Sequence, residues 1–167
     1  WRSLADLAPR SFGGLVRSVH RYSSDLVMML VLAHALRTLL ARKFADARWL
    51  AWVSGLALLG LVWFIGWSGY WLVWDVRAQL LALDSIRALD VLPIFGEPML
   101  RLFTSDATVP SLLFFVVFFL HMALPLGLAG GLALHLARQS RTQLLPNWRL
   151  SVWLTCAVLV AALVFPA

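Results

Sequence analysis

The chain has 167 residues, of which 62% are apolar, only 13% are charged and four are histidine, and its formal net charge is +6. A soluble domain carries about twice that share of charged residues, and it could not bury so much apolar surface. The single cysteine excludes a disulfide-rich secreted scaffold, and the apolar excess excludes a disordered or collagen-like chain. The composition therefore predicts a polytopic membrane protein.

In chain order, the sequence begins with a mixed segment and then contains four long apolar stretches. Charged residues, proline and glycine interrupt residues 1–19, so we expect an interfacial approach segment there. Because the first residue is Trp rather than Met, we also expect further sequence upstream. Each apolar stretch has roughly the 17 to 25 residues that cross a bilayer core as a helix. The four expected spans are Ser24–Ala41, Trp49–Val73, Val109–Ala137 and Trp148–Phe165.

The charge of the connecting loops predicts how the spans cross the membrane. The loops at residues 42–48 and 138–149 are basic, whereas the loop at residues 74–108 has more acidic than basic residues. Basic loops stay in the cytoplasm, so the first and third spans run inward and the other two run outward. The positive charge is therefore an orientation signal, and we expect no nucleic-acid partner.

The acidic outer loop is too long for a simple connection. Its stretch RAQLLALDSIRAL has helical periodicity, and VLPIFGEP contains the turn-forming residues Pro93, Gly96 and Pro98. We expect one or two short amphipathic helices on the outer surface.

The four histidines form two pairs with one spacing. His20 and His34 are 14 residues apart, and so are His121 and His135. Fourteen helical residues rise about 21 Å and return to within roughly 40° of the same face. Because the first and third spans run in the same direction, we expect His20 to face His121 near the outer surface and His34 to face His135 near the inner surface. Two opposed imidazoles suit a haem iron, whereas a tetrahedral zinc site would need more ligands.

Two arginines flank the histidines of the first span. Arg17 lies three residues before His20, and Arg37 lies three residues after His34. Haem propionates would point toward the two membrane surfaces, where these guanidinium groups would pair with them. Snorkelling of arginine at a helix end is the alternative explanation.

Glycines of the second span repeat the histidine spacing. Gly55 and Gly69 are also 14 residues apart, and we expect them to let a flat porphyrin approach the helix. Ordinary helix packing explains glycine in a membrane helix equally well, as at Gly60 and Gly66. Pro125 lies midway between the histidines of the third span, where it should kink the helix.

Three stretches resemble the amino-terminal half of the cytochrome b family, as found in cytochrome bc complexes. LVRSVHRYSSDL with LAHALR resembles the second family helix, and GLALLGLVWFIGWSGYWLVWD resembles the third. VLPIFGEPMLRLF with LHMALPLGLAGGLALHL resembles the outer loop and the fourth helix. The resemblance extends over about residues 17–138, and more loosely over the fourth span. It implies an all-α membrane four-helix bundle that binds two stacked haem b groups, one at His20 and His121 and one at His34 and His135, and that exchanges electrons with quinol or quinone.

Departures from the family limit what the resemblance implies. The first membrane helix of the family is not in this sequence, and we expect either that it precedes Trp1 or that a partner supplies it. Residues 1–140 are then expected to form the dihaem domain, and residues 141–167 an additional transmembrane helix. Val73 and Ser140 stand where the family has a proline and, often, a histidine of the inner quinone site. The proline–glutamate–tryptophan–tyrosine type motif of the outer quinol site is also absent. The resemblance therefore implies haem binding but not a complete two-site quinone cycle.

The leading functional hypothesis is an electron-transfer subunit of a quinol-linked oxidoreductase complex, respiratory or photosynthetic, in the bacterial inner membrane. It is either the cytochrome b of a bc-type complex or the membrane anchor of another respiratory enzyme. The chain has no Cys-x-x-Cys-His motif, so an iron–sulfur protein or a c-type cytochrome is expected as a partner. The alternative is a transporter or channel that uses intramembrane His and Arg as a proton relay.

Overall fold

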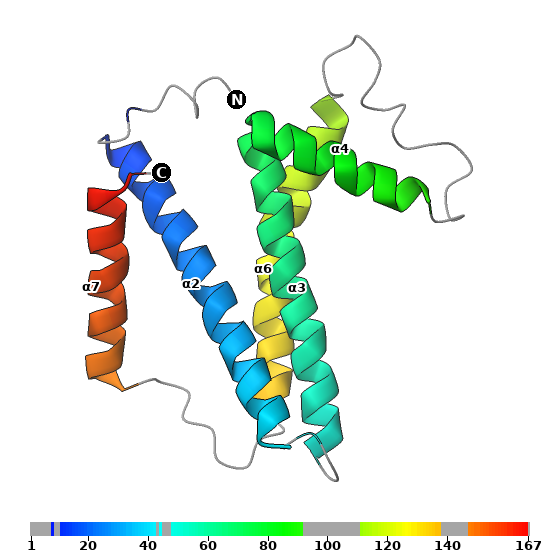
Figure 1. The fold of residues 1–167 in the computed structure, drawn as a ribbon, viewed down its shortest axis with the longest axis vertical. Coiled ribbons are helices and arrows are strands. Elements are labelled where there is room, and N and C mark those ends of the chain that lie inside the picture. The colour runs from blue at the N-terminus through cyan, green and yellow to red at the C-terminus, as the bar shows by residue number, and fades with distance from the viewer. Residues whose placement is uncertain are drawn as a thin grey trace. The chain divides into compact units, whose positions relative to one another are not determined.

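The computed structural model describes residues 8, 11–42, 44, 48–91, 111–137 and 147–166. These residues form five helices (Figure 1), namely α2 (Phe12–Leu40), α3 (Trp49–Val73), α4 (Val76–Asp90), α6 (Ser111–Ala137) and α7 (Trp148–Val164). None of the described residues lies in a β-strand, so the expected all-α fold is confirmed.

Three of these helices, α2, α3 and α6, are each long and apolar enough to cross a membrane, and the chain is a multi-pass membrane protein. Large apolar side chains lie on their outer surfaces, as Leu126 does with an exposed fraction of 76%. Exposed apolar side chains are stable here because the surrounding solvent is lipid rather than water. The apolar helix α7 has 17 residues and rises about 25 Å, somewhat less than a bilayer core of about 30 Å. Its crossing of the membrane stays a prediction.

The helix α2 begins at Phe12, well before the boundary expected at Ser24. Its N-terminus is capped by Ser11, whose side chain accepts a hydrogen bond from the Gly14 amide at 3.1 Å. Further along, Ser18 donates its hydroxyl to the Gly14 carbonyl at 2.9 Å. Ser18 therefore interrupts the apolar pattern of the sequence but not the helix, because its hydroxyl forms a hydrogen bond to a backbone carbonyl one turn earlier.

The described chain divides into two compact units, which are treated separately below. The α4 unit spans residues 64–127 and contains the second part of α3, all of α4 and the first part of α6. The α7 unit contains the described residues up to Trp63 and from Leu128 onward, which include α2, the first part of α3, the last part of α6 and α7.

In the α4 unit, the helix expected from RAQLLALDSIRAL is confirmed as α4. It follows a sharp turn at Trp74, where φ is 53°, and its first turn is capped by Asp75, which accepts the Ala78 amide at 2.7 Å. Its buried residues Ala82 and Ile86 pack around Trp71 of α3. The turns expected at Pro93, Gly96 and Pro98 lie outside the described residues.

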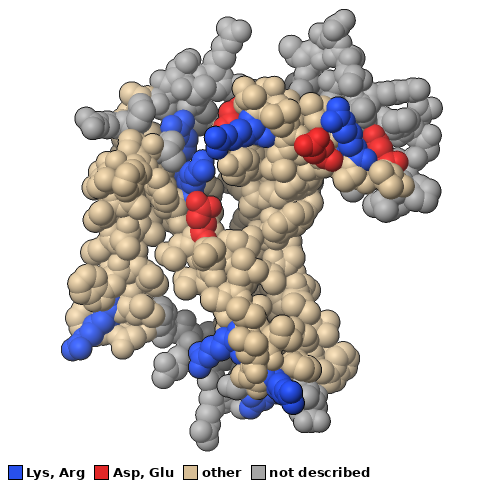
Figure 2. Space-filling model, in the orientation of Figure 1, with Lys and Arg blue, Asp and Glu red and all other residues tan. Residues whose placement is uncertain are grey.

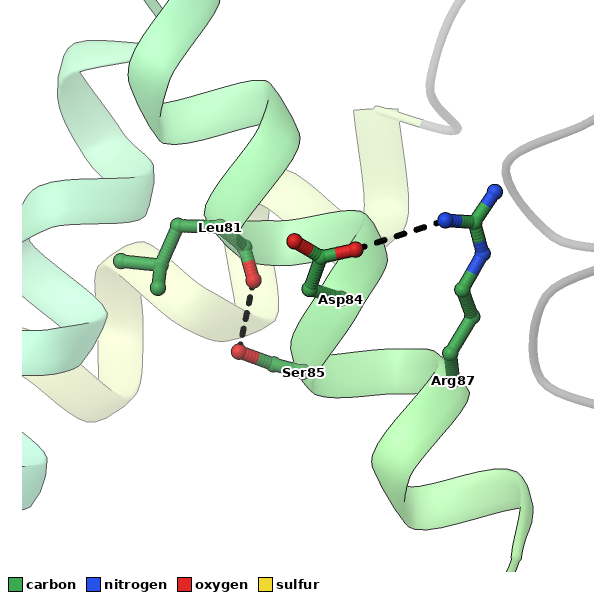
Figure 3. A network of polar contacts seen from close by, with 4 residues as sticks. All are labelled: Leu81, Asp84, Ser85 and Arg87. Atoms are coloured by element: carbon green, nitrogen blue, oxygen red, sulfur yellow. Dashed lines mark hydrogen bonds and ion pairs between the residues drawn. The ribbon is translucent and has the colours of Figure 1, made fainter.

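Polar contacts attach α4 to α3. The indole Nε1 of Trp67 donates to the Ser85 hydroxyl at 3.1 Å, and Ser85 in turn donates to the Leu81 carbonyl at 2.6 Å (Figure 3). On the other side of α4, Arg87 and Asp84 form an exposed ion pair at 3.4 Å. The hydrogen bond from α3 spans two helices, whereas the ion pair joins residues of α4 alone.

The Ser85→Ala variant is expected to loosen α4. Removing the hydroxyl removes an acceptor of the Trp67 indole and costs about 1 kcal/mol of local stability, or roughly a fivefold faster amide exchange. Hydrogen exchange measured by mass spectrometry over residues 76–90 tests this. The Asp84→Asn variant is the matched control, because an exposed ion pair contributes little. Equal exchange rates in the two variants would contradict the expectation.

In the α7 unit, α7 packs beside α2 (Figure 1). The Tyr22 hydroxyl donates to the Phe165 carbonyl at 2.6 Å, next to the C-terminus of α7. This bond occupies a carbonyl that the helix itself leaves without an amide partner. The last turn of α2 and the first turn of α3 lie at one end of this unit, which is the end that bears the candidate site.

Candidate functional site

A cavity of about 680 Å³ lies in the α7 unit, with walls from α2, α3 and α6; we call it the His34 cavity. Its lining is mostly apolar, with residues such as Val27, Leu56 and Leu132. Two imidazoles reach it, His34 from α2 and His135 from α6. The volume falls within the range of about 300 to 1,000 Å³ that is usual for ligand and cofactor pockets. The structure thus brings together the two histidines expected at the inner level.

Two guanidinium groups belong to the same cavity. Arg37, which the sequence placed beside His34, is part of the lining, and so is Arg48 at the start of α3. Figure 2 shows basic side chains gathered where α2 ends and α3 begins, and none of the described residues at this end of the α7 unit is acidic. A largely apolar wall with cations at one end suits a flat apolar molecule that carries anionic groups on one edge.

A serine hydroxyl lies against the His135 ring. Ser54 donates its hydroxyl hydrogen to the Ala51 carbonyl at 3.1 Å, and its oxygen lies 2.9 Å from His135 Nδ1. In this arrangement the Ser54 oxygen acts as an acceptor, which matches the His135 tautomer that carries its proton on Nδ1. That tautomer keeps the lone pair on Nε2, the atom available to bind a metal.

The glycine next to this serine leaves room for the ring. A Cβ atom at Gly55 would lie 3.4 Å from His135 Cε1, at van der Waals contact. A Cβ atom at Gly60, in the same helix, would meet no atom within 4 Å. The two glycines therefore differ: Gly55 lies against a histidine and Gly60 does not.

In the α4 unit, the ring of His121 also has acceptors beside its Nδ1 atom. His121 Nδ1 lies 3.0 Å from the Ile65 carbonyl oxygen and 3.4 Å from the Ser68 hydroxyl. A carbonyl oxygen has no hydrogen to give, so His121 Nδ1 is the donor, and the lone pair of the ring lies on Nε2. Ser68 donates to the same Ile65 carbonyl at 2.9 Å.

The glycine of this level is in closer contact. A Cβ atom at Gly69 would lie 2.6 Å from His121 Cε1 and 3.2 Å from Nδ1, whereas one at Gly66 would meet nothing within 4 Å. Gly69 also lies one turn after Ile65 in α3. Its missing side chain therefore opens the path by which the imidazole reaches the Ile65 carbonyl.

The remaining predicted residues lie on α2 or inside α6. His20 and Arg17 lie on α2, in the same helix as His34, and Pro125 lies inside α6. His20 belongs to the α7 unit and His121 to the α4 unit, so the expected outer pair stays a prediction. The kink at Pro125 also stays a prediction.

Hydroxyl groups on α2 repeat the histidine spacing as well. Ser24 donates to the His20 carbonyl at 2.7 Å, and Thr38 donates to the His34 carbonyl at 2.8 Å. Each expected ligand of α2 is thus followed, one turn later, by a hydroxyl bonded to its backbone. The repeat on α2 therefore extends beyond the imidazoles themselves.

The donor set favours a porphyrin over a bare metal ion. Within the described part of the chain, no three His, Cys, Asp or Glu side chains gather closely enough to hold an ion on their own. The His34 cavity instead offers two imidazoles, a mostly apolar wall and two guanidinium groups. A haem brings most of the ligands of its iron itself and would need only two nitrogens from the protein, which His34 and His135 would provide, so the residues fit it.

Three residues of these sites do not stand out in the sequence. Arg48 is one of several charges of a basic loop, and Ser54 and Ser68 are serines within an apolar span. A signal for the serines was nonetheless present, because Ser54–Gly55 and Ser68–Gly69 are identical dipeptides 14 residues apart. That spacing equals the spacing of His121 and His135.

The family model described as cytochrome b/b6/petB matches residues 7–164 of the chain, which is nearly its whole length.

Proposed function

The chain belongs to the cytochrome b family of haem-binding membrane electron-transfer proteins, and from this premise we propose that it is a dihaem subunit. In this role it carries electrons across the membrane between a quinone pool and partner redox subunits. The observation that carries the proposal is the His34 cavity, where imidazoles from two helices share one largely apolar space.

At the inner level, His34 and His135 would hold the haem iron through their Nε2 atoms. The bond from His135 Nδ1 to Ser54 supports this assignment, because it keeps Nε2 unprotonated. Arg37 and Arg48 would pair with the propionates, since both line the same cavity. The apolar wall would exclude water and thereby help to set the potential.

At the outer level, His121 and His20 would be the two ligands, with Arg17 nearby on α2. The bond from His121 Nδ1 to the Ile65 carbonyl supports the role of His121. Gly69 has no side chain and would leave space on α3 for the His121 ring, as Gly55 does for the His135 ring at the inner level. When bound, haem supplies a one-electron ferric/ferrous couple, and two such groups at different depths let charge cross the bilayer.

The partners follow from what the chain lacks. Its one cysteine cannot hold an iron–sulfur cluster, and it has no Cys-x-x-Cys-His motif for a c-type haem. We therefore propose that an iron–sulfur protein, a c-type cytochrome or both are the partner redox subunits of this chain. The proposed location is the bacterial cytoplasmic membrane. Purification from native membranes and identification of the co-purifying subunits tests this assembly.

The purified chain is expected to show the absorption bands of b-type haem in a reduced-minus-oxidised spectrum. Two haem groups per chain are expected in a pyridine haemochrome assay. Addition of a quinol should reduce at least one of them. A colourless protein would overturn the proposal and would favour the alternative function, a transporter or channel with a His and Arg proton relay.

A further inference from the structure

We propose that Ser54 is a positioning residue for His135, because its hydroxyl oxygen accepts the Nδ1–H of that ring. Ser68, the corresponding serine beside His121, does not position its histidine in this way. The inference rests on the proposed function, since it concerns how strongly His135 donates to haem iron. It goes beyond that function because it assigns the two haem levels different supporting groups, a side chain at one and the backbone at the other.

The first step is the direction of the bond at Ser54. Its hydroxyl points one turn back along α3, to the Ala51 carbonyl at 3.1 Å. The free lone pairs of the oxygen then face His135 Nδ1 at 2.9 Å, a good length for a hydrogen bond between nitrogen and oxygen. Among the described residues, His135 Nδ1 contacts the Ser54 hydroxyl and no backbone carbonyl, so Ser54 is its protein partner there.

The second step is the contrast with Ser68. This hydroxyl makes the same bond one turn back, to the Ile65 carbonyl at 2.9 Å. His121 Nδ1, however, lies closer to the Ile65 carbonyl, at 3.0 Å, than to the Ser68 hydroxyl, at 3.4 Å. The His121 ring therefore bonds chiefly to the backbone, and removing the Ser68 hydroxyl leaves its main acceptor in place.

The distance between each imidazole and the glycine of α3 explains the difference. At Gly69 the His121 ring lies so near to α3 that a Cβ atom would be 2.6 Å from it, and from this position it reaches the Ile65 carbonyl. At Gly55 the ring stays further out, at 3.4 Å from a Cβ position, and it meets the serine oxygen instead. The two Ser–Gly dipeptides thus have different hydrogen bonds beside them, one from an imidazole to a serine hydroxyl and one from an imidazole to a backbone carbonyl.

The chemical consequence concerns the donor strength of Nε2. An acceptor at Nδ1–H makes an imidazole more basic and fixes its orientation, and a more basic ligand stabilises ferric over ferrous iron. Loss of the Ser54 hydroxyl should therefore raise the reduction potential of one haem. Loss of the Ser68 hydroxyl should change the potential of the other haem much less.

Redox titration of the haem-loaded chain, followed optically and by electron paramagnetic resonance, tests the inference. In Ser54→Ala, one midpoint potential is expected to rise and the resonance of the same haem to broaden, while the other haem is unchanged. Ser54→Thr keeps the hydroxyl and should restore the wild-type potential. Ser68→Ala is the matched control, with the same atoms removed from the same kind of dipeptide, and should shift its haem less.

Several outcomes decide the matter. Wild-type potentials and resonances in Ser54→Ala would overturn the inference, as would an equal shift in Ser68→Ala. Haem loss from Ser54→Ala that Ser54→Thr prevents would support it. If Ser54→Ala does not accumulate, Ser54→Cys keeps the volume with a weaker acceptor, and a raised potential there also supports it. A wild-type chain that binds no haem would overturn the proposed function itself, and that result is read from the spectrum before any variant is made.

Discussion

The His34→Ala variant is expected to lose one of the two proposed haem groups and to keep the other. His34 lines a single cavity together with His135, and its removal leaves that cavity with one imidazole. One axial nitrogen holds a haem far more weakly than two, whereas the ligands proposed for the other level are untouched. The haem-to-protein ratio from a pyridine haemochrome assay, together with the remaining midpoint potential, measures the loss.

Thr38→Val is the matched control for this variant. Thr38 lines the same cavity and lies one turn after His34, but its hydroxyl bonds to the His34 carbonyl rather than to any proposed cofactor atom. Valine keeps the shape of the side chain, so both haem groups should remain. Retention of both haem groups in His34→Ala would refute the assignment of His34 as a ligand. Loss of haem from Thr38→Val would show that any substitution in this cavity releases haem, so the loss in His34→Ala would no longer identify a ligand.

The Gly69→Ala variant is expected to be the most damaging glycine substitution. The added Cβ would lie 2.6 Å from His121 Cε1, so the ring must turn away and its bond to the Ile65 carbonyl is broken. Overpacking of this kind costs about 1 to 3 kcal/mol, and the displaced Nε2 no longer meets iron at the proposed position. Loss of one haem and a lower melting temperature are expected, measured by absorbance and by thermal unfolding in detergent.

Substitutions at two other glycines of α3 are the controls for Gly69→Ala. Gly66→Ala should leave haem content and stability near wild type, because its Cβ would meet no atom within 4 Å. Gly55→Ala should lie between the two, since its Cβ would touch His135 Cε1 at 3.4 Å without forcing it away. Equal effects at Gly66 and Gly69 would mean that glycine acts through the helix backbone and not through the space that it leaves for histidine.

The elements of this protein were largely predictable from its sequence. The second expected span, Trp49–Val73, coincides with α3, and the third and fourth end or begin at the residues where α6 and α7 do. Long apolar runs determine such helices because a membrane-spanning segment must satisfy its backbone hydrogen bonds internally. The start of α2 was less predictable, because an apolar count cannot register that Ser11 and Ser18 are satisfied by local backbone groups.

The spacing of the histidines was also readable from the sequence. Two pairs of equal spacing place two imidazoles near one face of each of two helices, because the rise and rotation of an α-helix are fixed. Only the tertiary structure decided which groups support them. The partners depend on how closely α3 approaches the neighbouring helices. This approach brings Ser54 to one imidazole and the Ile65 carbonyl to another, and it makes Arg48 part of a cavity wall. Spacing along one helix sets the height of a side chain, but the distance between helices, which determines its partners, is set by packing.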